Sequence, residues 1–206
     1  MELILKYFPS LDLLQKERLT KLLPIYKEWN AMINVISRKD LDSFYCNHVL
    51  HSLTLGLNFN FDKINNVMDI GTGGGFPGIP LAILYPNIQF TLVDSIGKKI
   101  KVVNAVADFL ELENVTAIND RFENIKNSHD VIVSRAVAPA LKLVNFTRKS
   151  LTDNGTYLFL KGGNLEDEKH ELLSYYSKSK WKETNIIDLI QEPFFETKKI
   201  IELKLF

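Results

Sequence analysis

The sequence predicts an α/β fold in which helices flank a seven-stranded sheet and a helical cap precedes it. Residues 1–60 carry apolar side chains at helical spacing and show no strand pattern. After residue 60, short apolar runs alternate with helical segments, as in a parallel sheet covered by helices. The first of these runs ends in a turn with five glycines among eight residues. We therefore expect a cap over residues 1–60 and one compact unit over residues 61–206.

The composition is that of a globular protein without a strong charge bias. Lys plus Arg and Asp plus Glu both total 25, so any surface for nucleic acid must come from local clustering of basic residues. Cys46 is the single cysteine and cannot form an internal disulfide, which is typical of a reducing compartment. The chain shows neither an apolar run of membrane-spanning length nor a secretory signal. We expect a cytoplasmic monomer without a metal site.

Two helices are expected in the cap. Ser10 suits the N-cap of the first helix, and Pro24 should end or kink it. The second helix should run from about Leu41 to Leu57 because its apolar residues recur at helical spacing.

The rest of the chain should alternate between strands and helices. The expected strands are residues 64–70, 88–93, 114–118, 130–134, 156–160, 184–190 and 198–205. The expected helices are residues 77–84, 97–110, 139–149 and 164–176, and Asp153–Gly155 should form a turn. The last two strands have no room for a helix between them, so they should pair as an antiparallel hairpin with the last strand reversed.

The glycine turn follows the first strand of the sheet, where ligands of open α/β sheets bind. Gly73, Gly75 and Gly78 match the G-x-G-x-x-G spacing of dinucleotide sites. Asp69 argues against a dinucleotide, because a carboxylate there would repel a pyrophosphate. The same carboxylate would favour S-adenosylmethionine, whose ammonium and sulfonium groups are cationic.

The complete pattern of the turn is D-x-G-x-G-x-G, formed by Asp69, Gly71, Gly73 and Gly75. It is the pattern of the Rossmann-like class I methyltransferases, which use S-adenosylmethionine. An oxidoreductase is disfavoured: Tyr176 and Lys180 have the Tyr-x-x-x-Lys spacing of short-chain dehydrogenases, but the amino-terminal glycine motif of those enzymes is absent.

The other cofactor contacts should come from the ends of the next three strands. Asp94 can accept hydrogen bonds from both ribose hydroxyls. Asp120 could accept from the adenine amine, and Phe122 could pack on the adenine ring. Arg135 stands where the methyl group must be delivered, and it could contact the methionine carboxylate or an RNA phosphate.

Several motifs in order along the chain share one family resemblance. They are Trp29-Asn30 with Asn34–Ser37, Asn47–Leu53, Gly71–Gly78, Asp94-Ser95 with Lys98-Lys99, Ser134–Ala136 and Leu160–Gly162. Together they resemble the bacterial 16S rRNA guanine-N7 methyltransferase family, also called glucose-inhibited division protein B. The resemblance implies cofactor-binding roles for Gly71, Phe76, Phe122, Glu123 and Arg135. Asn47 and His51 depart from the family pattern R-H-x-x-D-S-L, which has arginine and aspartate at these positions.

The resemblance implies methyl transfer to N7 of a guanine in 16S rRNA, guanine 527, in free RNA, in the small ribosomal subunit or in an assembly intermediate. Because N7 keeps a lone pair in the neutral base, we nominate no general base and expect catalysis by positioning. The alternative is a class I methyltransferase acting on another RNA or on a small molecule. The candidate RNA-binding residues are Arg38, Lys39, Lys98, Lys99, Lys101, Arg121, Arg148 and Lys161.

Overall fold

A computed structural model of the chain describes residues 1–206 except for the side chain of Arg38. Its strands are β1 Asn66–Ile70, β2 Gln89–Asp94, β3 Val115–Asn119, β4 His129–Arg135, β5 Leu151–Gly162, β6 Lys180–Asn185 and β7 Lys198–Lys204. Its α-helices are α1 Glu2–Tyr7, α2 Leu13–Met32, α3 His51–Asn58, α4 Gly78–Leu84, α5 Gly97–Phe109, α6 Ala140–Thr147 and α7 Glu166–Tyr175. A π-helical segment, Tyr45–Leu50, leads directly into α3.

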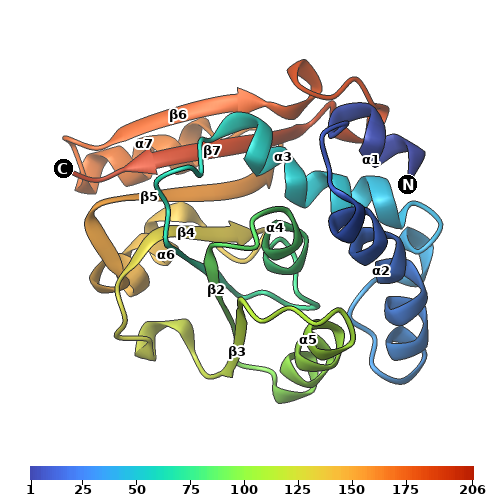
Figure 1. Cartoon of the computed structure of the whole chain (residues 1–206). Coiled ribbons are helices and arrows are strands. Elements are labelled where there is room, and N and C mark those ends of the chain that lie inside the picture. The colour runs from blue at the N-terminus through green and yellow to red at the C-terminus, as the bar shows by residue number, and fades with distance from the viewer.

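The strands form one sheet in the order β3-β2-β1-β4-β5-β7-β6 (Figure 1). Strands β1 to β5 are parallel, and β7 runs antiparallel to both of its neighbours, β5 and β6. This arrangement confirms the predicted fold class, including the reversed last strand. The order also brings the carboxyl ends of β1, β2, β3 and β4 to one edge of the sheet, where the glycine turn lies.

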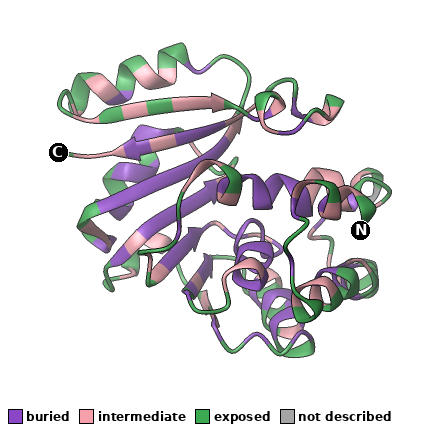
Figure 2. Cartoon of the chain, turned by 45° about the horizontal axis from the view of Figure 1, so that its top comes forward, coloured by how far each residue is buried: buried purple, intermediate pink, exposed green. Residues whose placement is uncertain are grey.

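Helices cover both faces of the sheet, and its central strands are buried (Figure 2). Alternate side chains of each central strand enter a different core. Helices α1 to α5 pack on the face that carries Val67, Leu92 and Val131. Helices α6 and α7 pack on the face that carries Met68 and Ile132. The cap helices therefore share one hydrophobic cluster with the sheet, and the division of the chain near residue 60 stays a prediction.

Helix α2 differs from the prediction at its start and at its proline. Asp12, not Ser10, is the N-cap, and it forms a capping box with Gln15. Pro24 lies inside α2 without ending it. A proline has no N–H to donate to the carbonyl four residues earlier, which is that of Thr20. The Tyr45 hydroxyl lies 3.1 Å from this carbonyl oxygen and donates to it instead, so the cap compensates for the proline.

Two strand predictions are wrong at their boundaries. Strand β6 occupies Lys180–Asn185 rather than residues 184–190, because the apolar run after it folds as a 3-10 turn that buries Ile186 and Ile190. The true strand is a polar edge strand and lacks an apolar pattern. Residues Asp153–Gly155 lie within β5, where its register with β4 shifts, rather than in a turn before it. Among the described residues, no helix has the length and apolar character needed to cross a membrane.

Candidate active site

The glycine turn exposes bare backbone at the end of β1. Gly71, Gly73 and Gly75 have φ values of +67°, +60° and +96°, which side-chain-bearing residues rarely adopt. A Cβ atom at Gly71 would lie 2.6 Å from Val137 Cγ2, so Val137 packs directly on the turn. A Cβ atom at Gly73 would meet only the Gly71 carbonyl oxygen, 4.0 Å away, among the described residues. The turn therefore leaves room for a ligand to approach its backbone closely.

Asp69 lies fully buried beneath this turn. Its Oδ2 atom accepts hydrogen bonds from Thr72 Oγ1 at 2.6 Å and from the Gly78 N–H at 2.9 Å. Its Oδ1 atom has no hydrogen-bond partner among the described residues. Burial raises the pKa of Asp69 to about 6, although the hydrogen bonds from Thr72 and Gly78 oppose this shift. Asp69 therefore stabilises the turn through hydrogen bonds and places a buried carboxylate beneath it.

Asp94 ends β2 and holds the turn from the side. Its Oδ2 atom accepts from the Gly73 N–H and its Oδ1 atom from the Ile96 N–H, both at 2.9 Å. The ammonium of Lys99 lies 3.8 Å from Oδ2. Because a carboxylate has about four lone-pair sites, Asp94 keeps acceptor capacity for a ligand.

A cavity of about 560 Å³ opens above these residues. Of the predicted cofactor residues, it is lined by Gly71, Asp94, Phe122, Glu123 and Arg135. The other predicted cofactor residues, Asp69, Gly73, Gly75, Phe76 and Asp120, are not part of its wall as described. The first four of these belong to the turn or lie beneath it. The Asp120 Oδ1 atom accepts from the Arg121 N–H and from Asn124 Nδ2, so it shapes the loop after β3.

One wall of this cavity consists of residues that were not predicted from the sequence. Val137, Lys142 and Phe146 line it from the segment after β4 and from α6. Phe146 is 42% exposed and its ring lies 6.2 Å from that of Phe122. An aromatic residue one turn after a lysine on the polar face of an amphipathic helix is the signal that could have identified this wall.

Arg135, at the end of β4, is held by the cap. Its Nη2 atom lies 3.1 Å from His48 Nδ1, and its Nη1 atom donates to the Asn47 carbonyl at 3.5 Å. The guanidinium also lies 5.1 Å from the centre of the Phe76 ring, a cation–π contact. Burial lowers the pKa of Arg135 to about 10, while Asp69 favours its charged form, so it stays protonated.

His48 is a packed, neutral histidine. Its ring contacts those of Phe44 and Phe76, and burial, together with Arg135, lowers its pKa to about 4. Since Arg135 donates to Nδ1, the ring proton is on Nε2, which lies 3.8 Å from Asp40 Oδ2. His48 thus orients Arg135 without adding a second positive charge.

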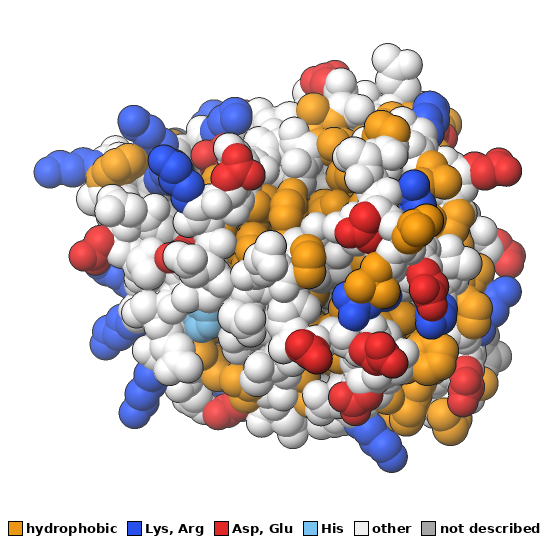
Figure 3. Space-filling view, in the orientation of Figure 1, with side chains coloured by type: hydrophobic (Ala, Val, Ile, Leu, Met, Phe, Trp, Pro, Cys, Tyr) orange, Lys and Arg blue, Asp and Glu red, His pale blue; other side chains and the backbone are white. Residues whose placement is uncertain are grey.

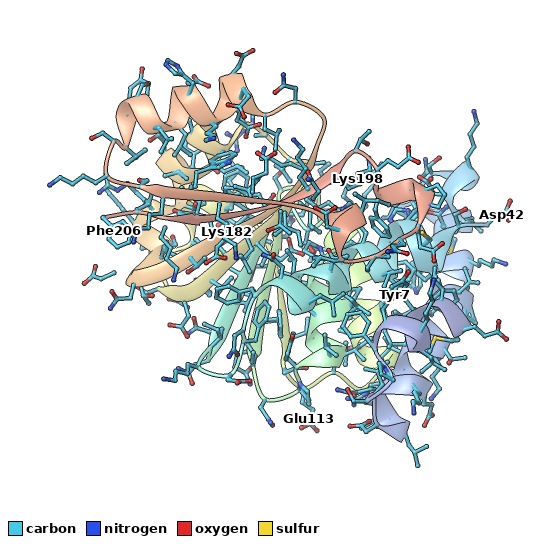
Figure 4. The ribbon with its side chains drawn as sticks, turned by 90° about the horizontal axis from the view of Figure 1, so that it is seen from above. Tyr7, Asp42, Glu113, Lys182, Lys198 and Phe206 are labelled. Atoms are coloured by element: carbon cyan, nitrogen blue, oxygen red, sulfur yellow. The ribbon has the colours of Figure 1, made fainter. Side chains whose placement is uncertain are left out.

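A second cavity of about 360 Å³ lies beside the first. Arg135, Ala136 and Val137 line both cavities and form their shared wall. Ala136 has a φ of +53°, a strained value for a residue with a side chain. The other walls come from α3, the end of β5, α7 and the start of β7, where Lys198 lies toward the cap (Figure 4).

The predicted basic residues fall into distinct environments. Lys99 and Arg121 line the first cavity, and Lys98 is exposed beside it. Lys161 lines the second cavity, but its ammonium is bound 2.6 Å from Glu168 and donates to the Ala138 carbonyl. Of the remaining candidates, Lys39, Lys101 and Arg148 are exposed, and the side chain of Arg38 lies outside the described residues.

A different group of lysines lies away from the site. On the face shown in Figure 3, basic side chains gather over β6 and the C-terminus. This group includes Lys180, Lys182 and Lys204, which line a pocket there. The register of β5, β7 and β6 puts it at the end of the sheet opposite the glycine turn. It therefore serves as a natural control for the basic residues at the site.

The chain matches the family model for rRNA small subunit methyltransferase G (GidB) over residues 15–198. The chain belongs to this family. Ribosomal RNA small subunit methyltransferase G from Flavobacterium psychrophilum is 49% identical, over 100% of this chain and 98% of that protein. The protein of the same name from Christiangramia forsetii is 46% identical, over 100% and 97%.

Solved structures with this fold include several methyltransferases. The ribosomal protein L11 methylase of Lactobacillus delbrueckii subsp. bulgaricus matches with a TM-score of 0.60 at 13% identity, covering 76% of this chain and 78% of that one. A SAM-dependent methyltransferase from Aquifex aeolicus matches with a TM-score of 0.58 at 12% identity, covering 75% and 89%. These comparisons confirm the predicted family and class I fold, and they support S-adenosylmethionine as the cofactor.

We expect Gly71→Ala to weaken cofactor binding strongly. The added Cβ atom meets Val137 on the cavity wall and must sit at a φ of +67°. Calorimetry with S-adenosylhomocysteine should show at least a tenfold loss of affinity, about 1.4 kcal/mol. Gly163→Ala is the matched control, since it has a φ of +77° but no described atom within 4 Å. Equal affinities in the two variants would contradict this account of the turn.

The stability of the protein should fall as pH rises from about 4 to 6 because of Asp69. Its pKa is about 6 in the folded state and 3.8 when unperturbed, so the unfolded state loses its proton first. Above pH 6 the buried carboxylate costs about 3 kcal/mol. Asp69→Asn should remove this component from urea unfolding measured across that range, whereas exposed Asp153→Asn should not. Parallel pH curves for wild type and Asp69→Asn would contradict the prediction.

Proposed function

We propose that the chain transfers a methyl group from S-adenosylmethionine to N7 of a guanine in 16S rRNA, at guanine 527. The observation that carries the proposal is the meeting of two cavities at the shared wall Arg135–Val137. One cavity fits a nucleoside cofactor and the other leaves room for an acceptor base. The shared wall carries Arg135 but no residue that could act as a general base. Methylation of guanine N7 needs no such base, because N7 loses no proton.

The residues of the first cavity fit S-adenosylmethionine. Asp94 has free lone pairs for ribose hydroxyls, and the rings of Phe122 and Phe146 offer apolar surface to adenine. Lys142, which lines this cavity alone, would meet the methionine carboxylate. The buried Asp69 favours the cationic end of the cofactor, and the close packing of Val137 on Gly71 limits the floor of the cavity.

When bound, the cofactor supplies a sulfonium-linked methyl group: the N7 lone pair forms the new N–C bond, the S–C electron pair stays on sulfur, and no proton leaves. The protein's task is then to position the base and exclude water. His48, Asn47 and Phe76 hold the Arg135 side chain in one conformation. Arg135 can therefore bind a substrate oxygen with little further loss of conformational entropy. The neutral state of His48 limits repulsion of the methylated purine, which carries the positive charge after transfer.

Lys98, Lys99 and Arg121 supply the RNA surface in this proposal. Two of them line the cofactor cavity and the third is exposed next to them. Lys98, Lys99 and Arg121 form the basic rim of the cofactor cavity. An RNA that places one unstacked guanine in the site must bring its backbone close to this rim. Lys161 is left out of this surface, because its ammonium is already paired with Glu168.

Methyl mapping tests the proposed reaction directly. We expect radiolabel from S-adenosylmethionine to enter unmodified small-subunit RNA, offered free or as a particle. Borohydride and aniline treatment, which cleaves RNA at N7-methylguanine, should then cut at one guanine. Label at a base position other than N7, or transfer only to a small molecule, would overturn the proposal. Gly71→Ala is the negative control.

Removing two positive charges from the basic rim should weaken RNA binding and reduce its dependence on salt concentration. In Lys98→Gln/Arg121→Gln we expect the slope of log K against log salt to fall by roughly 1.5, about 0.7–0.9 per lost phosphate contact. Lys180→Gln/Lys182→Gln removes the same charge at the far end of the sheet and should leave the slope unchanged. The same slope change in both double variants would assign the effect to net charge alone.

A further inference from the structure

His51 lies at the wall of the second cavity, and one of its ring nitrogens, Nε2, makes no hydrogen bond among the described residues. It is 6% exposed, and its ring packs edge-on against those of Phe194 and Phe195. Its Nε2 atom is buried and has no hydrogen-bond partner in the part of the chain that the structure describes. A buried polar atom without a partner costs about 1–3 kcal/mol, which a ligand's hydrogen bond would offset.

The protonation state of His51 determines which ligand group can bind it. The Asn47 carbonyl acts on the His51 ring as a hydrogen-bond acceptor, and Nε2 has no partner among the described residues. We therefore assign the ring proton to the nitrogen other than Nε2. Burial, together with Arg135 and Lys198, keeps the pKa of His51 well below its usual value. The ring is therefore neutral, and Nε2 offers a lone pair. This atom can accept a hydrogen bond from a ligand but cannot donate one.

We propose that the second cavity receives the guanine base, with His51 Nε2 accepting a hydrogen bond from its N1–H and Arg135 donating one to its O6. This assignment rests on the proposed function. It makes His51 a specificity-determining residue rather than a catalytic base.

The order of atoms around guanine matches the order of groups around the cavity. In guanine, O6 lies between N7 and N1. A base that turns N7 toward the cofactor cavity therefore presents O6 beside the shared wall, where Arg135 lies, and N1–H farther inside. Arg135 uses two of its five N–H donors on His48 and Asn47, so donors remain for O6.

Adenine presents the opposite pattern at the same positions. Its 6-amino group would face the donors of Arg135, and its N1 lone pair would face the lone pair of His51 Nε2. Enzymes that act on an extruded base commonly read its Watson–Crick edge in this way. The remaining charges in the cavity are the Lys161–Glu168 pair and Lys198, whose ammonium lies 5.2 Å from the Phe194 ring. Neither of these groups donates to His51 Nε2, which has no partner among the described residues.

A substrate with N1-methylguanine at the target position tests the pairing. In the wild type we expect kcat/KM for guanine to exceed that for N1-methylguanine by at least about 100-fold, because the methyl group removes the donor and meets the ring. His51→Ala loses the acceptor and opens space for that methyl group. The guanine preference should therefore fall at least tenfold, while S-adenosylhomocysteine affinity stays within twofold.

Three further variants separate recognition from packing. His51→Asp restores an acceptor and should recover guanine transfer relative to His51→Ala. His51→Leu fills the space without an acceptor, and it should lose about 10–100-fold in kcat/KM for guanine even if the alanine variant does not fold. His129→Ala is the matched control: it removes another buried histidine, bonded to Ser150 and Thr91, and should not change the preference.

The results separate failure of the proposed function from failure of the His51 assignment. No N7 transfer by the wild type would overturn the proposed function and this inference together. N7 transfer with an unchanged guanine preference in His51→Ala, or full activity in His51→Leu, would overturn the inference alone. Loss of S-adenosylhomocysteine binding in the His51 variants would also overturn it, since His51 would then act through the cofactor cavity.

Discussion

The site depends on the hydrogen bond between the Asp69 carboxylate and the Gly78 N–H. This contact closes the turn from the end of β1 to the start of α4, and the hydroxyl of Thr72 shares the same carboxylate oxygen. A Cβ atom at Gly78 would lie 2.9 Å from that oxygen, so the closure requires glycine there. This closure spans the turn in which Gly71, Gly73 and Gly75 have positive φ values.

The helical cap takes part in the same construction. The Tyr26 hydroxyl donates to the Gly74 carbonyl at 2.5 Å, so the turn is held from the cap side as well as from the sheet side. Farther along, His48 and the Asn47 carbonyl hold Arg135. The Asn47 side chain donates to Asp40, the carboxylate that faces His48. Asn47 and His51, the two positions that depart from the family pattern, thus lie beside Arg135 and at the wall of the second cavity.

Sequence reasoning located the parts of the site that depend on local pattern. The glycine turn, Asp94 at the end of β2 and Arg135 at the end of β4 follow from strand periodicity and from the rule that strand ends converge. Features that depend on long-range contacts could not be found this way. Lys161 is paired with Glu168, a contact that sequence pattern does not reveal, and its role in RNA binding stays a prediction. Pro24 was expected to end or kink its helix, but α2 continues through it, and the Tyr45 hydroxyl supplies the missing donor. Asp69 led to the prediction of S-adenosylmethionine, which the comparisons support. Its burial beneath the turn could not be predicted from the sequence.

The charges around the shared wall follow one constraint. The proposed methyl transfer from a sulfonium to a neutral purine would move a positive charge without removing it, so the site would have to tolerate a cation before and after the reaction. Arg135 is the fixed cation at this wall, and Asp69 below it favours its charged state. Burial keeps His48 and His51 neutral beside it. Protonating either histidine would add a second cation next to the purine that gains charge. In the proposed reaction, the same low pKa values that leave Nε2 of His51 as an acceptor would therefore also keep the site electrostatically suited to a cationic product.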